Sequence, residues 1–338
     1  MKRRAVIERA VGETRAAVYE GRRLVELHLD RWSAAGAPKL GERWTGQVVT
    51  VDNSVAGAWV RLGEGPDSLL QFKAQGDLPR LTDGARIDVT ITREAIAEKG
   101  PLIRYAGEAT HDAPSPVTRL SLEDRLSARF HGIAFDEASV STVDDATERT
   151  VAVPGGGSVT IDRTQALIAV DVDKGAAEKL VDLCYDAATV IMTQLRLRGL
   201  GGLVILDLPN LRKPRQRATV MKRLEEMGEA DPANVRIAPF SRFGVVEMTR
   251  GQDGPSLDAK RLDRFGRETV ETRALAALRR LKREGAASKG AQLELTVERD
   301  AWNWLEAAPF DWRGAMTERL GARFTAQPGE RTDVKADR

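Results

Sequence analysis

Two apolar strands that each end in an aspartate, with one helix between them, constrain the fold more than any other feature of the sequence. The apolar run at 166–170 leads directly into Asp171, and the run at 203–206 leads into Asp207, 36 positions further on. Between them, apolar residues recur at helical spacing from about 180 to 195. Because two parallel strands need a long crossover between them, usually a helix, this order predicts an α/β unit.

The positions of the aspartates indicate a ligand site. In α/β sheets ligands bind beyond the carboxyl ends of the strands, which is where Asp171 and Asp207 are expected. Asp173 comes two positions after Asp171, so both side chains should point to the same face of the strand. Carboxylates with no His or Cys beside them suit hard cations such as Mg²⁺ or Mn²⁺. The alternative is that these residues are helix caps and turn acids, which are common after strands.

Charge is distributed unevenly along the chain. In total 52 basic residues offset 50 acidic ones, and the formal net charge of +2 by itself argues against a polyanionic partner. Residues 194–223, however, contain eight basic residues and a single acidic one, Asp207. A positive field beside a carboxylate metal site suits phosphodiester cleavage, because the basic side chains hold the polyanion while the metal activates water. A solvated helix face is the simpler alternative. The eight basic residues are Arg196, Arg198, Arg212, Lys213, Arg215, Arg217, Lys222 and Arg223.

Composition narrows the class of protein. Hydrophobic residues make up 42% of the chain, which is enough for packed cores and too much for a disordered chain. No apolar run approaches the ~20 residues of a membrane span, and the N-terminal residues lack the apolar core of a signal peptide. We therefore expect a soluble, cytoplasmic protein with no membrane partner. The single cysteine, Cys184, excludes an internal disulfide and a Cys-cluster zinc site, and it should lie in the core side of its helix.

The order of segments predicts an α+β chain with several domains. Short strands broken by turn residues predict a β hairpin at 1–35 and a small barrel, such as an OB-fold, at 36–110. A polar, Pro-rich linker and a helix occupy 111–135, and the α/β domain follows at 136–255. A small α+β domain at 256–338 contains a long helix and three tryptophans that we expect in its core or in an interface. These are Trp302, Trp304 and Trp312.

Several segments resemble the ribonuclease E/G family of single-strand endoribonucleases. PGGGSVTIDRTQALIAVDVDKG is similar to the family's Gly-rich turn, strand, turn and Ile-Asp-Val-Asn strand end, and QLRLRGLGGLVILDLPNL and FSRFGVVEMTR resemble the signatures that follow. This likeness covers about 135–255 almost continuously. A weaker, collinear likeness joins GETRAAVYEGRRLVELHLDR to the family's opening hairpin and ERWTGQVVTVDNSVAGAWVRLG to its S-one-type OB RNA-binding domain. The resemblance implies a DNase-I-like or RNase-H-like α/β catalytic domain and a small α+β C-terminal domain.

The resemblance implies magnesium-dependent hydrolysis of phosphodiester bonds in single-stranded RNA, in RNA processing or decay. Asp171 and Asp207 fall where the family has its two magnesium-binding aspartates, with Mn²⁺ as the alternative cation. Asp173 falls where the family usually has an Asn that orients the site. These three aspartates are therefore the candidate catalytic residues.

The resemblance also implies contacts with RNA. Trp59 falls at an aromatic of the OB domain that stacks on RNA, and Lys99 at a basic residue of that domain that approaches the RNA backbone. Arg242 lies in a motif that borders the cleft. Trp44 opens a barrel strand and is either core or RNA-facing, and Phe72 lies near the place of a second stacking aromatic. Arg196 and Arg198 of the basic stretch complete the candidate RNA-binding residues.

Departures from the family pattern leave a second function open. Only 111–135 stands where the family has a long segment with a 5′-monophosphate sensor, so we expect no sensing of the 5′ end. The family's Cys-Pro-x-Cys zinc link is missing, so we expect no structural zinc, and a homo-oligomer would not be zinc-linked. Asp at position 173 adds a negative charge and can misplace the attacking water. The alternative function is a non-catalytic RNA-binding or ribosome-associated protein of the same family.

Overall fold

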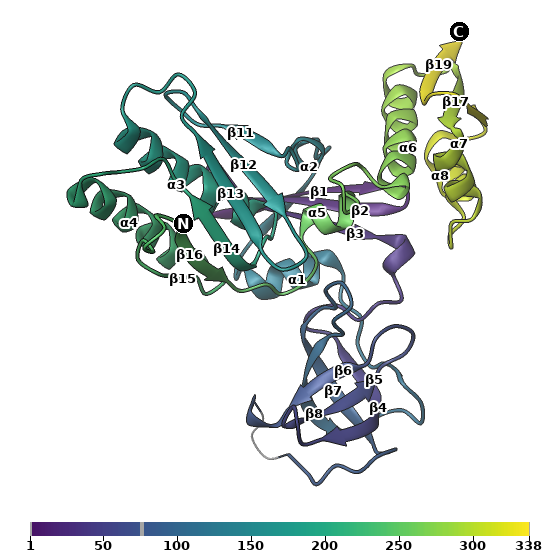
Figure 1. The fold of residues 1–338 in the computed structure, drawn as a ribbon. Helices are drawn as coiled ribbons and strands as arrows, with labels where there is room; N and C mark the ends of the chain where they lie inside the picture. Colours follow the sequence, from purple (N-terminus) through teal and green to yellow (C-terminus); the bar gives the residue numbers. More distant parts are fainter. Residues whose placement is uncertain (1, 75–77, 338) are drawn as a thin grey trace.

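The chain is a mixed α+β protein built on four separate sheets. A computed structural model describes residues 2–74 and 78–337. Figure 1 shows three parts around the N-terminal strands: a barrel below, a large sheet with helices on one side, and a small C-terminal unit on the other. The α+β class expected from the sequence is thus confirmed.

The N-terminal residues form a three-stranded antiparallel meander rather than the expected hairpin. Its turns contain Gly12 (φ +84°) and Gly21 (φ +64°), a backbone region that favours glycine. At Gly12 an added Cβ would also lie 2.3 Å from the Leu275 side chain, so the turn approaches the C-terminal unit closely. A fourth strand from beyond the expected linker pairs in parallel with the first. The strands are β1 (Arg3–Ala10), β2 (Glu13–Glu20), β3 (Arg23–Arg31) and β10 (Ala134–Glu137).

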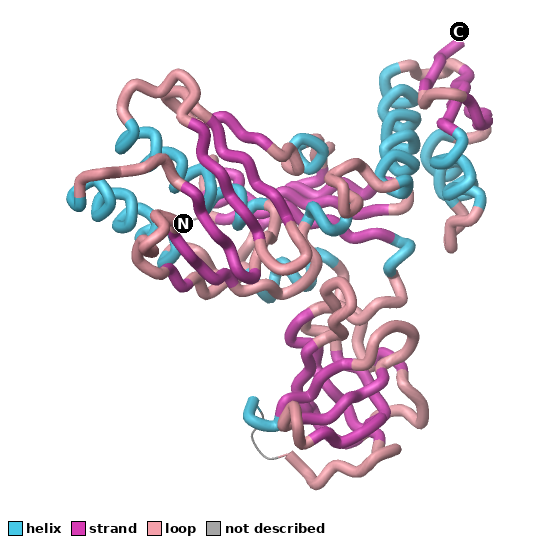
Figure 2. The backbone as a smooth tube through the Cα atoms, in the orientation of Figure 1, coloured by secondary structure: helices cyan, strands magenta, loops and turns pink. Residues whose placement is uncertain are grey.

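The second sheet closes on itself as a small barrel, because β4 pairs with both β5 and β7. Within it β6 runs parallel to β8, and every other neighbouring pair is antiparallel. Figure 2 shows this part as almost entirely strand and loop. Its strands are β4 (Arg43–Asp52), β5 (Gly57–Arg61), β6 (Ser68–Gln71), β7 (Arg86–Arg93) and β8 (Leu102–Glu108), with the short β9 (Ser115–Pro116) beside β4.

A short helix connects the barrel to the rest of the chain. α1 (Leu122–Arg129) begins with a capping box, in which the Ser121 side chain accepts from the Asp124 backbone N–H, as its sequence suggests. Its apolar side packs against the N-terminal sheet through Leu122 and Leu126. The one-turn α2 (Thr142–Asp145) follows β10. The segment expected to be only a linker and helix thus also supplies β9 to the barrel sheet.

The largest core lies between a six-stranded sheet and two helices. The sheet order is β11-β12-β13-β14-β16-β15, and the central pair β13–β14 is parallel, as the strand–helix–strand pattern predicts. α3 also contacts β3, so it lies between this sheet and the N-terminal sheet. The elements are β11 (Thr150–Ala152), β12 (Ser158–Arg163), β13 (Ile168–Asp173), α3 (Leu180–Leu197), β14 (Gly202–Asp207), α4 (Pro214–Glu229), β15 (Arg236–Ile237) and β16 (Val246–Arg250).

The C-terminal unit packs three helices on a three-stranded sheet. Trp312 is buried in its core, and Trp302 and Trp304 are partly buried against the same cluster, so the structural reading of the three tryptophans is confirmed. Its elements, preceded by α5 (Leu257–Arg261), are α6 (Val270–Ala287), β17 (Gln292–Glu298), α7 (Arg299–Glu306), α8 (Trp312–Leu320), β18 (Phe324–Gly329) and β19 (Asp333–Asp337).

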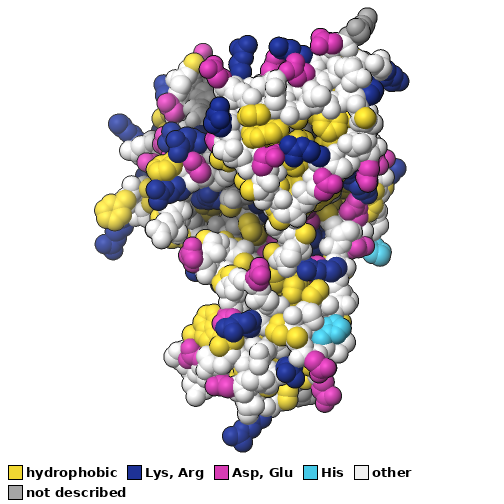
Figure 3. All heavy atoms as spheres, turned by 90° about the vertical axis from the view of Figure 1, so that its right-hand side faces the viewer, with side chains coloured by type: hydrophobic (Ala, Val, Ile, Leu, Met, Phe, Trp, Pro, Cys, Tyr) yellow, Lys and Arg dark blue, Asp and Glu magenta, His cyan; other side chains and the backbone are white. Residues whose placement is uncertain are grey.

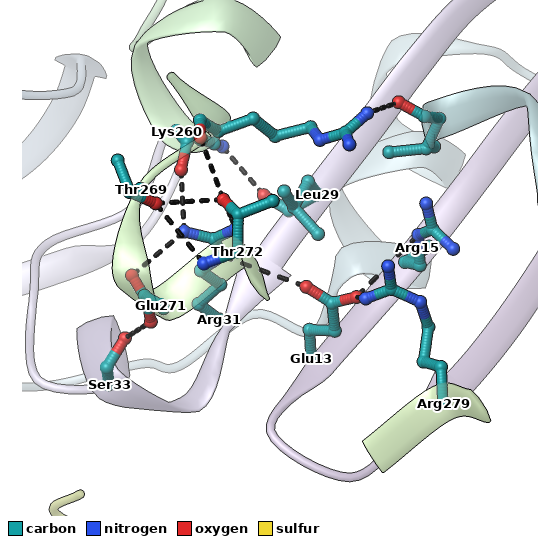
Figure 4. Close-up of polar contacts among 12 residues, drawn as sticks. Glu13, Arg15, Leu29, Arg31, Ser33, Lys260, Thr269, Glu271, Thr272 and Arg279 are labelled. Atoms are coloured by element: carbon teal, nitrogen blue, oxygen red, sulfur yellow. Dashed lines mark hydrogen bonds and ion pairs between the residues drawn. The ribbon is translucent and has the colours of Figure 1, made fainter. Parts of the chain in front are cut away.

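A buried polar network fixes the C-terminal unit to the N-terminal strands (Figure 4). The Arg31 guanidinium, on β3, donates to the Lys260 carbonyl at 2.6 Å, to Glu271 at 2.8 Å and to the Thr272 hydroxyl at 2.7 Å. Arg279 of α6 pairs with Glu13 of β2, and both are nearly inaccessible. Such groups are costly to leave unpaired, so the network specifies how the two parts dock.

The outer surface carries both signs of charge. On the face drawn in Figure 3, basic and acidic side chains are interspersed, and a narrow waist separates the barrel from the body. None of the described helices is long and apolar enough to cross a membrane.

Candidate active site

Asp171 and Asp207 lie side by side at the carboxyl ends of two parallel strands. They are direct register partners in the β13–β14 pair, the central pair of the sheet in Figure 1. Register partners on neighbouring strands point to the same face, and their strands lie about 4.8 Å apart. Both residues are exposed, and neither makes an ion pair or a side-chain hydrogen bond with another described residue. The sequence prediction that these two carboxylates converge is confirmed.

The two aspartates line a cleft of about 470 Å³. Its walls come from the strand ends, from the loop that leads into α4, from α4 itself and from the loop between β15 and β16. Both carboxylates are on the wall, so a bound molecule in the cleft would contact them directly. The lining residues are Asp171, Val172, Asp207, Leu208, Pro209, Asn210, Leu211, Arg217, Phe240, Arg242, Phe243 and Gly244.

Cationic and aromatic side chains share this cleft with the aspartates. The Arg217 guanidinium lies 5.3 Å from the Phe240 ring centroid, and its Nε donates to the Leu211 carbonyl at 2.7 Å. These two contacts hold Arg217 in place. Arg242 is exposed and lines the cleft, as the sequence analysis expected of a residue bordering it. The cleft therefore offers negative charge from the strand ends and positive charge from the elements around them.

The donors present fit a magnesium ion. Mg²⁺ characteristically keeps several waters and takes only one or two protein carboxylates together with substrate phosphate oxygens. Two adjacent, unpaired, solvent-accessible carboxylates provide that donor set. Among residues 2–74 and 78–337 no group of three His, Cys, Asp or Glu side chains could enclose a metal ion, so a third protein ligand is not supplied there.

Asp173 is placed differently from its two neighbours. It is exposed near the end of β13, but it does not line the cleft. Its carboxylate accepts a hydrogen bond from the Gly175 backbone N–H at 3.0 Å, which closes the turn after the strand. The structure thus brings together Asp171 and Asp207, and Asp173 serves the turn beside them.

Two arginines predicted to bind RNA are structural, and that prediction is corrected here. Arg198 is 2% exposed, and its guanidinium pairs with Asp258 and donates to the Glu148 carbonyl. Arg196 is held by Glu20 at 3.2 Å and Glu26 at 3.4 Å. Burial and pairing leave neither side chain available to a phosphate. The exposed basic residues of the stretch are Arg212, Lys213, Arg215 and Lys222.

The barrel candidates divide between surface and core. Trp59 is half-buried, and its indole N–H donates to Asp52, whose pKa lies below its usual value because of hydrogen bonds from Ser54 and then Trp59. Lys99 is exposed in the turn before β8. Phe72 is partly buried against the barrel core.

Trp44 belongs to the core, so the RNA-facing alternative is wrong. It is 4% exposed, its indole N–H donates to Glu42 at 3.0 Å, and the Arg119 guanidinium lies 4.6 Å from its ring. An aromatic enclosed in this way has no free face on which a base could stack.

Some lining residues escaped sequence reasoning. Asn210, Arg217, Phe240 and Phe243 contribute to the cleft, and none of them lies next to an aspartate in the chain. The available signal was an aromatic between Arg242 and Gly244, because a turn seldom exposes a large apolar side chain without a reason.

Comparison with known proteins agrees with this geometry. The model of the Ribonuclease E/G family matches residues 111–253, which contain both aspartates and the cleft around them. Through this segment, the chain belongs to the ribonuclease E/G family. Ribonuclease E of Escherichia coli (strain K12) is 39% identical over 124 residues, which cover 35% of this chain and 12% of that protein.

Other members of the family match a longer stretch at lower identity. Ribonuclease G of Escherichia coli (strain K12) is 28% identical over 201 residues, 56% of this chain and 38% of that protein. Ribonuclease G of Salmonella typhimurium (strain SL1344) is 29% identical over 202 residues. The chain thus spans well under two thirds of these relatives, and the likeness is strongest where the two aspartates lie.

Proposed function

We propose that this chain is an endoribonuclease of the ribonuclease E/G type that hydrolyses phosphodiester bonds in single-stranded RNA with Mg²⁺. The observation that carries the proposal is the pair of register-matched, unpaired carboxylates, Asp171 and Asp207, at the floor of a cleft with cationic walls. Relatives named ribonuclease E and ribonuclease G support the reaction class.

The chain's own groups divide the work in the cleft. Asp171 and Asp207 would hold the ion, which when bound supplies neutralisation of phosphate charge and a lowered pKa for water. Arg242 and Arg217, on the same cleft, attract the polyanion and compensate the charge that develops on the phosphate oxygens. Asp173 keeps the turn behind Asp171 in place through its bond to Gly175.

We also propose that the barrel is an OB-fold that holds the RNA strand. Its closure through β4 and the parallel β6–β8 pair support this assignment. Trp59 would stack on a base and Lys99 would contact the backbone, the combination that serves single-strand binding. The RNase-H-like or DNase-I-like assignment of the mixed sheet, the cytoplasmic location and the absence of 5′-end sensing remain predictions.

The test is cleavage of an end-labelled, unstructured RNA by the full chain with and without Mg²⁺. Losing one partner of a ligand costs ~10–100-fold in metal sites, so Asp171→Asn and Asp207→Asn should each lower the rate by more than about 100-fold. Mn²⁺ binding followed by electron paramagnetic resonance should weaken in the same two variants.

A matched control comes from the same domain. Asp182 is exposed in the first turn of α3 and does not line the cleft, so Asp182→Asn should leave cleavage and Mn²⁺ binding unchanged. A wild-type chain that binds RNA without cutting it, and whose binding survives both strand-end substitutions, would replace the enzyme with the non-catalytic RNA-binding alternative.

A further inference from the structure

One aromatic side chain stands out on the surface of this protein. Phe243 is 95% exposed, whereas the next most exposed large hydrophobic among the described residues, Phe265, is 65% exposed. Leaving a phenyl ring almost wholly in water forgoes the burial that normally stabilises a fold. Single exposed apolar residues are common, so exposure alone decides nothing, and the surroundings of the ring must be considered.

The ring stands on an ordered turn. Residues 238–245 connect β15 to β16, and the Ala238 backbone N–H donates to the Glu247 carbonyl at 2.8 Å. Nearer the tip, Ser241 N–H donates to the Val245 carbonyl at 2.8 Å, and Gly244 N–H donates to the Ser241 carbonyl at 3.1 Å. Gly244 takes φ +89°, which glycine adopts at little cost. The backbone therefore presents Phe243 in a fixed direction.

The ring also lies on the cleft that contains Asp171 and Asp207. Arg242 precedes it and is exposed on the same cleft. None of the other exposed large hydrophobics of the described chain lines this cleft, so Phe243 is not part of a broad apolar patch that a protein partner would cover. A single flat apolar surface beside a cation and two carboxylates matches a nucleotide, which has a flat base next to a phosphate.

We propose that Phe243 is the stacking platform for a nucleobase adjacent to the scissile phosphate, and that it selects unpaired RNA at the cleavage step. This inference rests on the proposed function. A base in a duplex is already stacked on both faces, whereas a base in a single strand can place one face on the ring. Stacking tolerates every base, because each has a π-face, so the site would discriminate by strandedness more than by sequence.

Substitution of the ring gives the first test. Loss of one stacked base is worth about 5- to 150-fold in affinity, so Phe243→Ala should lower kcat/KM on single-stranded RNA within that range. Phe243→Tyr keeps the flat ring and should retain most of the activity. Phe265→Ala removes an exposed phenylalanine that does not line the cleft and should leave kcat/KM unchanged.

A second arm uses binding alone, so that it is independent of cleavage. Ten-nucleotide RNAs, each with 2-aminopurine at one position, are titrated with the protein in EDTA, and stacking on the ring should quench one of the probes. Phe243→Ala should abolish that quenching, and an abasic nucleotide at the quenched position should weaken wild-type binding while leaving the Ala variant unaffected.

The outcomes separate the two proposals. Quenching that depends on Phe243 without any cleavage would retain the platform and remove the enzyme. Cleavage that is equal in wild type and Phe243→Ala, together with additive effects of the abasic site and the substitution, would overturn the platform and retain the enzyme.

Discussion

At the scale of single residues, burial separates arginines that look alike in the sequence. Arg198 and Arg215 both belong to the basic stretch at 194–223. Arg198 is enclosed and its partner, Asp258, is itself 5% exposed, whereas Arg215 is exposed on α4 with no ion pair among the described residues. One guanidinium therefore stabilises the fold, and the other is free to attract a polyanion.

This difference predicts opposite phenotypes. Arg198→Ala leaves the Asp258 carboxylate buried without its partner and should lower the free energy of unfolding by ~3–5 kcal/mol. Arg215→Ala should change that free energy by less than ~0.5 kcal/mol, because its side chain is exposed and unpaired. Urea unfolding measures both changes.

The RNA readout should reverse the order. Under the proposed function, Arg215→Ala lowers the slope of log affinity against log salt by about 0.7 if it contacts one phosphate. Arg198→Ala, measured where it is folded, should keep the wild-type slope. Equal stabilities of wild type and Arg198→Ala would refute the structural role assigned to this residue.

The sequence could predict only what depends on neighbours along the chain. Asp171 and Asp207 were predictable because strand period and the helical crossover place them together without knowledge of side-chain packing. The pairing of Arg198 was not, because its partner lies 60 positions away in another element. Trp44 was ambiguous for the same reason, since the Glu42 and Arg119 contacts that enclose it appear only after the barrel closes.

At the scale of elements, the site depends on how two turns meet behind β13. Gly157 (φ +83°), just before β12, lies against the turn that follows Asp173. A Cβ at Gly157 would come within 2.5 Å of the Asp173 carbonyl oxygen, and one at Gly175 within 2.9 Å of the Gly157 Cα. Two glycines are therefore needed for the close approach that positions the end of this strand.

Gly157→Ala should consequently damage the site through the backbone. The methyl group would push the end of β13 away, and displacement of a reacting group by ~1 Å can cost about 100-fold in rate. We expect a similar loss of RNA cleavage, with weakened Mn²⁺ binding.

Gly155 provides the matched control in the same turn. It also has positive φ (+80°), but no atom lies within 4 Å of an added Cβ. Gly155→Ala should therefore cost only ~1–2 kcal/mol of backbone strain and leave cleavage unchanged. Equal cleavage by both alanine variants would show that the close contact does not position Asp171.

At the scale of the whole molecule, one buried carboxylate connects three parts of the structure. Glu26 of β3 is 4% exposed and pairs with Arg129 of α1 at 3.0 Å and with Arg196 of α3 at 3.4 Å. His28, on the same strand, lies 3.2 Å from it. Through Glu26 the N-terminal sheet is fixed both to the helix that follows the barrel and to the helix that crosses behind the candidate site.

This arrangement predicts how stability depends on pH. Burial tends to raise the pKa of Glu26, but the hydrogen bond and charge of His28 and the charges of the two arginines outweigh it and lower the pKa from 4.5 to about 2. A carboxyl group with a depressed pKa stabilises the fold fully above its unfolded value, and this contribution is lost as the pH falls through the folded value. The free energy of unfolding should therefore fall between about pH 5 and pH 2, by ~3 kcal/mol from this group.

Glu26→Gln isolates that contribution, because an amide occupies the same space and does not titrate. The variant should be ~3–5 kcal/mol less stable than wild type at pH 7, where it leaves two buried arginines without their anion. The difference should shrink as the pH approaches 2, since wild type then loses the same charge. Asp136→Asn, which breaks an exposed pair with Arg4, should change stability by less than ~1 kcal/mol at every pH. Urea unfolding at pH 7, 5, 4 and 3 measures all three proteins, and a constant gap between wild type and Glu26→Gln would mean that the connection between the three parts does not depend on the ionised carboxylate.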